Sequence, residues 1–121
     1  MATMQVPEIA TKFVAALKGD IDGLREICAP DCQLWHSNDN KWMLQGPALE
    51  AFAQAQKAGR IPSFGDIVVT PTGKGFLAQT SMTLDPFGTM HIVQLMTVQD
   101  GKITSLEEYI APEMDMSAAA Q

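Results

Sequence analysis

The sequence predicts a single α+β domain in which two or three helices pack on one face of a curved, mostly antiparallel sheet. Hydrophobic residues recur at helical spacing in the first half of the chain, and β-branched runs separated by turn-forming residues fill the second half. A length of 121 residues, 46% of them hydrophobic, suits one domain with its own core. We expect this domain to span 1–121, with a core over about 8–111 and a frayed tail at 112–121.

The helices are predicted in the N-terminal half. Residues 7–18 carry hydrophobic side chains at helical spacing, and Gly19 follows the last of them. Asp20 is a typical N-cap residue for a second, shorter helix that ends before Pro30. A third helix is predicted over roughly 47–58.

The remaining elements are predicted to be strands. Residues 32–36 form the first strand, and residues 37–40, Ser-Asn-Asp-Asn, are typical of a turn before a short return strand at 42–44. Asp100-Gly101 between two strand-like runs indicates a two-residue hairpin, because a type I′ turn requires positive φ at both central residues. The other strands are predicted at 62–72, 75–84, 89–99 and 102–110.

Counting outward from the hairpins sorts side chains onto two faces. The Asp100-Gly101 turn places Val93 opposite Glu108, and the preceding loop places Met82 opposite His91. Because an ionised Glu108 on an apolar face is costly unless it is paired or hydrated, this face indicates a pocket rather than a filled core. The predicted inner face holds Ile67, Val69, Ala78, Thr80, Met82, Leu84, His91, Val93, Leu95, Leu106, Glu108 and Ile110.

The opposite face is predicted to be too apolar for a sheet that faces water. We therefore expect a homodimer that packs sheet to sheet through this outer face. Beside the polar residues Gln79, Ser81 and Thr83, it carries Met90, Ile92, Met96, Val98 and Tyr109.

Charge and composition exclude several classes of partner. Eight Lys and Arg against fourteen Asp and Glu give a net charge of -6, so neither a nucleic acid nor a membrane is an expected partner. With no apolar run long enough to span a bilayer and no signal-peptide pattern at the N-terminus, we expect a cytoplasmic protein. Cys28 and Cys32 lack the neighbours of a disulfide scaffold or a zinc site, and no metal or cofactor is expected.

Three segments carry a resemblance to a known superfamily. They are Gly19-Asp20 with the run Ile-Cys-Ala-Pro-Asp-Cys-Gln-Leu-Trp-His at 27–36, Gly46-Pro47 ahead of Phe52, and Asp100-Gly101-Lys102-Ile103 with Glu108-Tyr109. Over about residues 8–111 the chain resembles the nuclear transport factor 2-like superfamily, in particular its SnoaL-like branch. The resemblance implies a cone-shaped α+β barrel with a pocket in its open mouth, often dimeric through the outer sheet. Members include ketosteroid isomerases, limonene epoxide hydrolases, scytalone dehydratases and polyketide cyclases.

The resemblance also compares single positions. His36 falls about where ketosteroid isomerases carry their catalytic Asp, and Glu108 about where the epoxide hydrolases keep one. Val93 stands where the isomerases have an oxyanion-hole acid, a device for which they are the standard example. Thr80 and Met82 stand where the epoxide hydrolases have an Arg and a second Asp. Neither activity is therefore carried over to this chain.

His36 is the main candidate for acid–base chemistry, because an imidazole can take or give a proton near neutral pH, and Asp39 is a candidate to orient it. Glu108 and His91 are expected to form a second polar pair. Plainer roles stay open: His36 and Asp39 only satisfy the turn, or Glu108 pairs with Lys12. The predicted pocket residues are Phe13, Trp35, Trp42, Thr80, Met82, Val93, Leu106 and Ile110.

Two functions are compatible with these residues. The first is a cofactor-free acid–base enzyme (isomerase, cyclase, dehydratase or hydrolase) that acts on a small hydrophobic molecule. The second is a non-catalytic ligand-binding or dimerisation module on the same fold.

Overall fold

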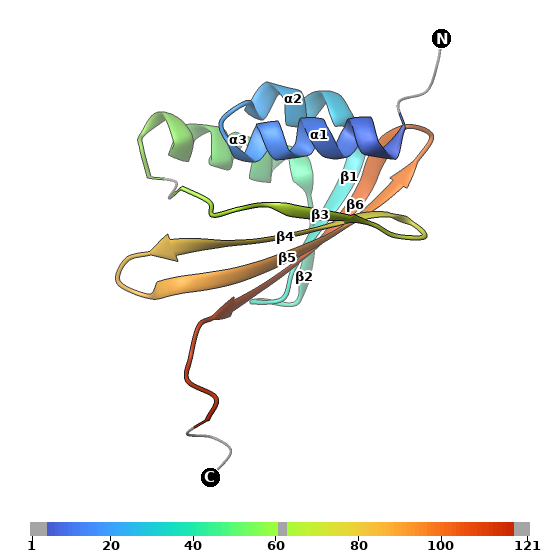
Figure 1. Cartoon of the computed structure of the whole chain (residues 1–121). Helices are drawn as coiled ribbons and strands as arrows, with labels where there is room; N and C mark the ends of the chain where they lie inside the picture. Colours follow the sequence, from blue (N-terminus) through green and yellow to red (C-terminus); the bar gives the residue numbers. More distant parts are fainter. Residues whose placement is uncertain (1–4, 61–62, 118–121) are drawn as a thin grey trace.

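The computed structural model describes residues 5–60 and 63–117 and confirms the α+β fold class. All three described helices, α1 (Val6–Leu17), α2 (Ile21–Ile27) and α3 (Gln45–Lys57), lie on one side of the sheet (Figure 1). The Asp20 side chain accepts a hydrogen bond from the backbone N–H of Gly23, as expected of an N-cap residue. The helices therefore cover one face of the sheet and leave the other face without a helical cover.

The sheet has six described strands in the order β2-β1-β6-β5-β4-β3. Every described pair is antiparallel except β1 with β6, and the sheet is not closed into a barrel. The strands are β1 (Cys28–His36), β2 (Lys41–Leu44), β3 (Val68–Pro71), β4 (Gly75–Leu84), β5 (Gly88–Gln99) and β6 (Lys102–Pro112).

Some strand boundaries differ from the predicted ones. β1 begins directly after α2, and an irregularity between Cys28 and Gln33 separates its two stretches of pairing with β6. The strand predicted over 62–72 is shorter, because only Val68–Pro71 pairs as a strand; residues 61–62 lie outside the described residues. The tail is paired further than predicted, since the Glu113 N–H donates to the carbonyl of Thr89 over 2.9 Å; residues 118–121 lie outside the described residues.

The last hairpin has the predicted turn but not the predicted register. Asp100 and Gly101 have φ of 51° and 75°, and Gln99 pairs with Lys102, as expected of the two-residue turn. Beyond it, Val98 pairs with Ile103 but Thr97 pairs with Ser105, so Thr104 is an additional residue in β6. The Thr104 hydroxyl donates to the Thr97 carbonyl over 3.4 Å at this β-bulge. Every pair beyond the bulge is therefore shifted by one residue.

The loop between β4 and β5 shifts the register a second time. Leu84 pairs with Gly88 rather than with Thr89, and Gly88 adopts a φ of 80° that favours glycine. The two shifts cancel, so the predicted faces of β4 and β6 are correct while the predicted face of β5 is wrong. On β5 the residues that face the helices are Ile92, Gln94 and Met96, and those that face outward are His91, Val93 and Leu95.

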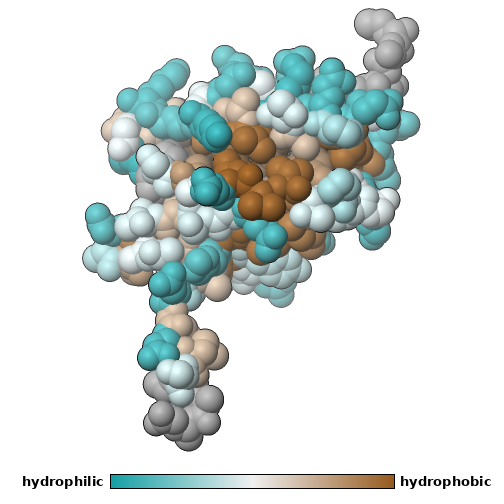
Figure 2. Space-filling view, viewed as in Figure 1, coloured by the Kyte–Doolittle hydropathy of each residue, from teal (hydrophilic) through white to brown (hydrophobic). Residues whose placement is uncertain are grey.

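The core lies between the helices and the inner face of the sheet. Phe13 of α1 meets Phe76 of β4 edge to face, with ring centroids 5.6 Å apart. Met96, which the predicted register placed on the outer face, is 2% exposed and belongs to this core. Figure 2 shows hydrophobic side chains on the surface between α1 and β3, where a shallow groove is lined by residues such as Val14 and Val69. No described helix is long and apolar enough to cross a membrane.

Candidate functional site

The space between the helices and the inner face of the sheet encloses a cavity of about 320 Å³. Its walls are mostly apolar and come from all three helices and from β1, β4, β5 and β6. A volume of this size is at the lower end of those that hold small-molecule ligands. The polar side chains in its lining are His36, Gln45, Arg60, Gln94 and Glu108. We call this space the inner cavity.

Three of these polar residues lie side by side on neighbouring strands. Gln94 of β5 pairs with Glu108 of β6, and Glu108 pairs with His36 at the end of β1. We call these three residues the polar row. Apolar residues occupy the paired positions on both sides: Met96, Leu106 and Leu34 on one side, and Ile92 and Ile110 on the other. The sheet register therefore places three polar groups together on an otherwise hydrophobic floor.

Glu108 makes a different contact with each carboxylate oxygen. Its Oε2 accepts a hydrogen bond from Gln94 Nε2 over 2.6 Å, a length expected of a charge-assisted bond. Its Oε1 lies 3.5 Å from His36 Nε2. The side chains of Glu108 and His36 are 17% and 28% exposed. Gln94 thus fixes the carboxylate while the other oxygen faces an imidazole that can carry a proton.

Two buried carbonyl oxygens of the cavity lining lack a hydrogen-bond donor. Gln45 and Gln94 are 4% and 8% exposed, and no group within residues 5–60 and 63–117 donates to Oε1 of either side chain. Gln45 begins α3 and its side chain hydrogen-bonds Cys28. The carbonyl oxygens of both glutamines are therefore buried acceptors without a donor in the described part of the chain.

No protein-family model and no curated protein matches the chain. An NTF2-like protein of unknown function from Burkholderia xenovorans LB400 superposes with a TM-score of 0.71 at 16% identity, over 96% of this chain and 93% of that one. The chain has the NTF2-like fold.

Two further structures with the NTF2-like fold have names that refer to chemistry. An LEH-like epoxide hydrolase from M. tuberculosis has a TM-score of 0.65 at 16% identity, over 85% of this chain and 80% of that one. A candidate polyketide cyclase from Sinorhizobium meliloti has a TM-score of 0.65 at 23% identity, over 84% of this chain and 94% of that one. Identities this low establish the fold and leave the activity to the site residues.

Several predicted site residues do lie in the inner cavity of this NTF2-like fold. His36 and Glu108 face each other there, and Phe13, Met82, Leu106 and Ile110 belong to its lining. Thr80 is buried on the same face of the sheet, but its hydroxyl donates to the carbonyl of Gly65 over 3.3 Å. The Glu108–Lys12 pair that the sequence left open does not form, because Lys12 Nζ contacts Glu26 Oε1 at 3.2 Å.

Two predicted histidine partnerships need correction. His91 is exposed on the outer face, where its Nε2 lies 2.9 Å from Glu113 Oε2, and it does not pair with Glu108 because the face of β5 is reversed. Asp39 accepts a hydrogen bond from the Lys41 N–H over 3.1 Å. Asp39 therefore stabilises the turn after β1, which is the structural role that the sequence left open beside the orientation of His36.

Besides Thr80, which is not part of the lining, three further predicted pocket residues lie outside the inner cavity. Val93 faces outward for the same reason as His91. Trp35 alternates with His36 along β1 and pairs with Trp42, so both indoles lie on the outer face, with ring centroids 6.5 Å apart. The ring centroids of Trp35 and Tyr109 are 5.1 Å apart, and Trp35 Nε1 donates a hydrogen bond to Asn40 Oδ1 over 3.0 Å.

The sequence did not identify Gln94, Gln45 or Arg60 as site residues. Gln94 could have been found only with the reversed face of β5, where it stands between Ile92 and Met96. Gln45 follows a short strand at the start of α3, a position that carries no sequence signal for burial. The described residues contain no group of three or more His, Cys, Asp or Glu side chains placed to hold a metal ion.

The cysteine pair is next to Gln45. Both Cys28 and Cys32 are free thiols. A hydrogen bond with Cys32 and burial raise the pKa of Cys28, and the same hydrogen bond lowers the pKa of Cys32. Cys28 therefore retains its proton, as expected of a small packing residue.

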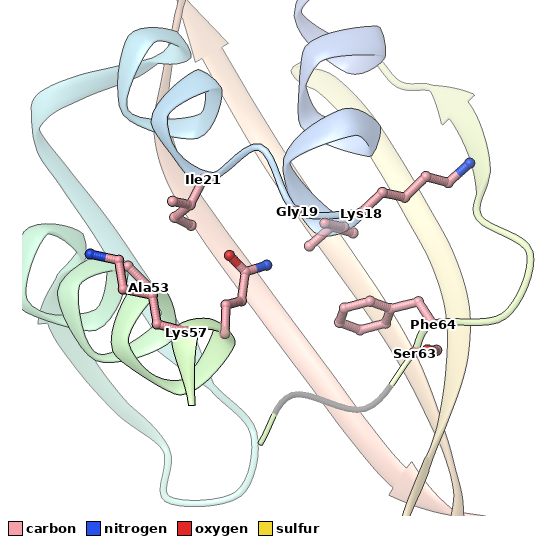
Figure 3. Close-up of a pocket in the computed structure, with 9 residues that line it drawn as sticks. Lys18, Gly19, Ile21, Ala53, Lys57, Ser63 and Phe64 are labelled. Carbon is pink, nitrogen blue, oxygen red and sulfur yellow. The ribbon is translucent and has the colours of Figure 1, made fainter. Parts of the chain in front are cut away.

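A second, larger hollow of about 590 Å³ adjoins the inner cavity. It lies between the junction of α1 and α2, the C-terminal half of α3 and the segment at Phe64 (Figure 3). Leu17 and Phe64 line both spaces, and the ring of Phe64 points into this hollow. Its charged lining residues are Lys18 and Lys57, so it lacks a pair that could exchange a proton. We therefore place the candidate site in the inner cavity.

Proposed function

We propose that this protein is a cofactor-free acid–base enzyme that moves a proton on a small, mostly apolar molecule held in the inner cavity. The observation that carries the proposal is the Glu108–His36 pair, 3.5 Å apart, on a hydrophobic floor. An ionisable pair in such surroundings loses hydration and is weak support for stability. Pairs of titratable groups in a cleft are typical of catalytic sites.

Each member of the polar row has a separate role in this proposal. His36 takes the proton from the substrate and returns it, while Glu108 orients the imidazole through Oε1. Gln94 is a positioning residue, because its hydrogen bond to Oε2 fixes the carboxylate. The apolar rows on either side exclude water and hold the hydrophobic part of the substrate.

The fold relatives support proton-transfer chemistry without fixing the reaction. The M. tuberculosis protein is named an LEH-like epoxide hydrolase, and the S. meliloti protein is named a candidate polyketide cyclase. By the resemblance, Thr80 and Met82 replace the Arg and second Asp of the epoxide hydrolases, and the Thr80 hydroxyl is already bonded to Gly65. This replacement favours a second candidate, a ligand-binding module without catalysis on the same fold.

A substrate panel separates the two candidates. Proton abstraction from carbon is read as deuterium uptake in D₂O by cyclohexanone and 2-tetralone and by their hydroxyl-bearing analogues 4-hydroxycyclohexanone and 6-hydroxy-2-tetralone. Epoxide opening is read as ¹⁸O uptake by cyclohexene oxide and styrene oxide and by the hydroxyl-bearing 2,3-epoxycyclohexanol and 3-phenylglycidol. We expect turnover of at least one compound, with loss of about a hundredfold or more in His36→Asn. The exposed His91 provides the matched control, His91→Asn. Binding of the panel without turnover of any member would favour the ligand-binding module.

We also propose that a second copy of the chain covers the outer face of the sheet. Trp42, Leu44 and Tyr109 are 50%, 55% and 44% exposed, and Trp35 lies in contact with Trp42 and Tyr109. The helices all lie on the other side of the sheet, so a second copy would bury the same aromatic surface on both partners (Figure 1). This surface replaces the one predicted from Ile92 and Met96, which are buried in the fold.

A cytoplasmic location remains a prediction from the sequence.

A further inference from the structure

The side-chain carbonyl oxygens of Gln45 and Gln94 in the inner cavity are buried, and no group in the described residues 5–60 and 63–117 donates a hydrogen bond to either. Native proteins pair the great majority of such groups, because leaving one unsatisfied costs about 1–3 kcal/mol. Here two occur in one cavity, on Gln45 and Gln94, both more than nine-tenths buried. A leucine or methionine at either position would fill a similar volume without that cost. The glutamines therefore suggest recognition rather than packing.

The remaining contacts of each glutamine leave the carbonyl oxygen for a ligand. Gln94 uses its amide N–H to hold Glu108, and that bond directs Nε2 along the floor toward β6. Gln45 enters from α3 on the opposite wall, where its side chain hydrogen-bonds Cys28. The ligand would therefore lie between the sheet and α3, with an acceptor on each side.

The chemistry of these acceptors restricts what can bind. A carbonyl oxygen accepts a hydrogen bond and cannot donate one, so its partner must carry an O–H or N–H group. The lining is otherwise mostly apolar, which suits a neutral molecule better than a fully charged one. A ligand that lacks a donor would leave the acceptors buried and unpaired, which lowers its affinity relative to a donor of the same shape.

We propose that the ligand of the inner cavity is an apolar molecule bearing a hydroxyl or N–H group, which donates to Oε1 of Gln94, Gln45 or both. The inference rests on the proposed function for the location of the ligand site. It adds the substrate class: an alcohol, phenol, enol or N–H heterocycle rather than a hydrocarbon, an ether or a ketone without a donor.

Matched probes test the donor requirement. The pairs 2-naphthol with 2-methoxynaphthalene and indole with 1-methylindole differ by the donor and one methyl group. Binding is measured by titration followed by ¹H–¹⁵N NMR. We expect each donor probe to bind about fivefold or more tightly than its methylated partner, the ratio that one net hydrogen bond supplies.

Variants assign that preference to the glutamines. Gln94→Met and Gln45→Met should each reduce the ratio, and the double variant should bring it close to one. The exposed Gln79 on the outer face of β4 gives the control Gln79→Met, which should leave the ratio unchanged. The methylated probes monitor the fold of each variant, because their affinity should not fall.

The outcomes separate this inference from the proposed function. Equal binding of both members of each pair would overturn the inference and leave the acid–base proposal in place. A donor preference that persists in the double variant would also overturn it. Absence of binding by all four probes up to millimolar concentration would overturn both the donor inference and the location of the site. A donor preference without turnover of any panel compound would support the inference and favour the ligand-binding module.

Discussion

The hydrogen bond between Gln94 and Glu108 gives a quantitative prediction about the polar row. The bond joins Nε2 to Oε2 over 2.6 Å, and the Glu108 side chain is 17% exposed. Hydrogen bonds to charged groups contribute about 1.5–3 kcal/mol, and the residual exposure favours the lower value. We therefore expect Gln94→Met to cost about 1.5 kcal/mol more in the wild-type background than in the Glu108→Met background.

The assay is a double-mutant cycle from urea unfolding followed by tryptophan fluorescence, at one fixed protein concentration. Glu108→Met alone should lower the free energy of unfolding by about 1–3 kcal/mol, because it leaves the buried Gln94 Nε2 without its acceptor. A second cycle, Gln79→Met with Glu108→Met, should be additive to within about 0.5 kcal/mol. A Gln94–Glu108 coupling inside that same limit would refute the geometry of the polar row.

Two further predictions concern the outer face and the core. Trp42→Glu should convert the proposed dimer to a monomer in sedimentation velocity. The control Phe87→Ser, at an exposed residue between β4 and β5, should leave the protein dimeric. A monomeric wild type at micromolar concentration would contradict the proposed dimer. Met96→Ala should lower the free energy of unfolding by about 2–5 kcal/mol, because this side chain is buried in the core. The exposed Met114 gives the control Met114→Ala, and a loss for Met96→Ala no larger than that of the control would contradict the register of β5.

Local sequence signals predicted most of the fold. The Asp100-Gly101 turn follows from the need for positive φ at two adjacent positions, and both residues have it. The bulge at Thr104 gave a weaker signal, because threonine is an ordinary strand residue. The extra residue shows in the sequence as a three-residue spacing between Ile103 and Leu106, which are both buried on the inner face. Since a shift of one residue exchanges the faces of a strand, the bulge and the shift at the β4–β5 loop together reversed the predicted face of His91 and Gln94.

The sequence predicted the position of Glu108 in the candidate site but not how the site is assembled around it. Glu108 was placed on the inner face correctly because the shifts at the two ends of β5 cancel across the three-strand unit. Its partner His36 lies on β1, which reaches β6 through a parallel, non-local pairing that no hairpin count can provide. Residues brought together by such a pairing, or by the start of a helix as with Gln45, depend on the tertiary structure rather than on local pattern.

The most direct test of the account compares two glutamates that differ mainly in their surroundings. Glu108 faces His36 inside the cavity, whereas Glu113 faces His91 at the surface. The measurement is the turnover rate of the panel compound with the highest wild-type activity, in Glu108→Gln and in Glu113→Gln. An acid–base site at Glu108 and His36 predicts a loss of about a hundredfold or more for Glu108→Gln and a wild-type rate for Glu113→Gln. Equal rates in the two variants would contradict an acid–base site at Glu108 and His36.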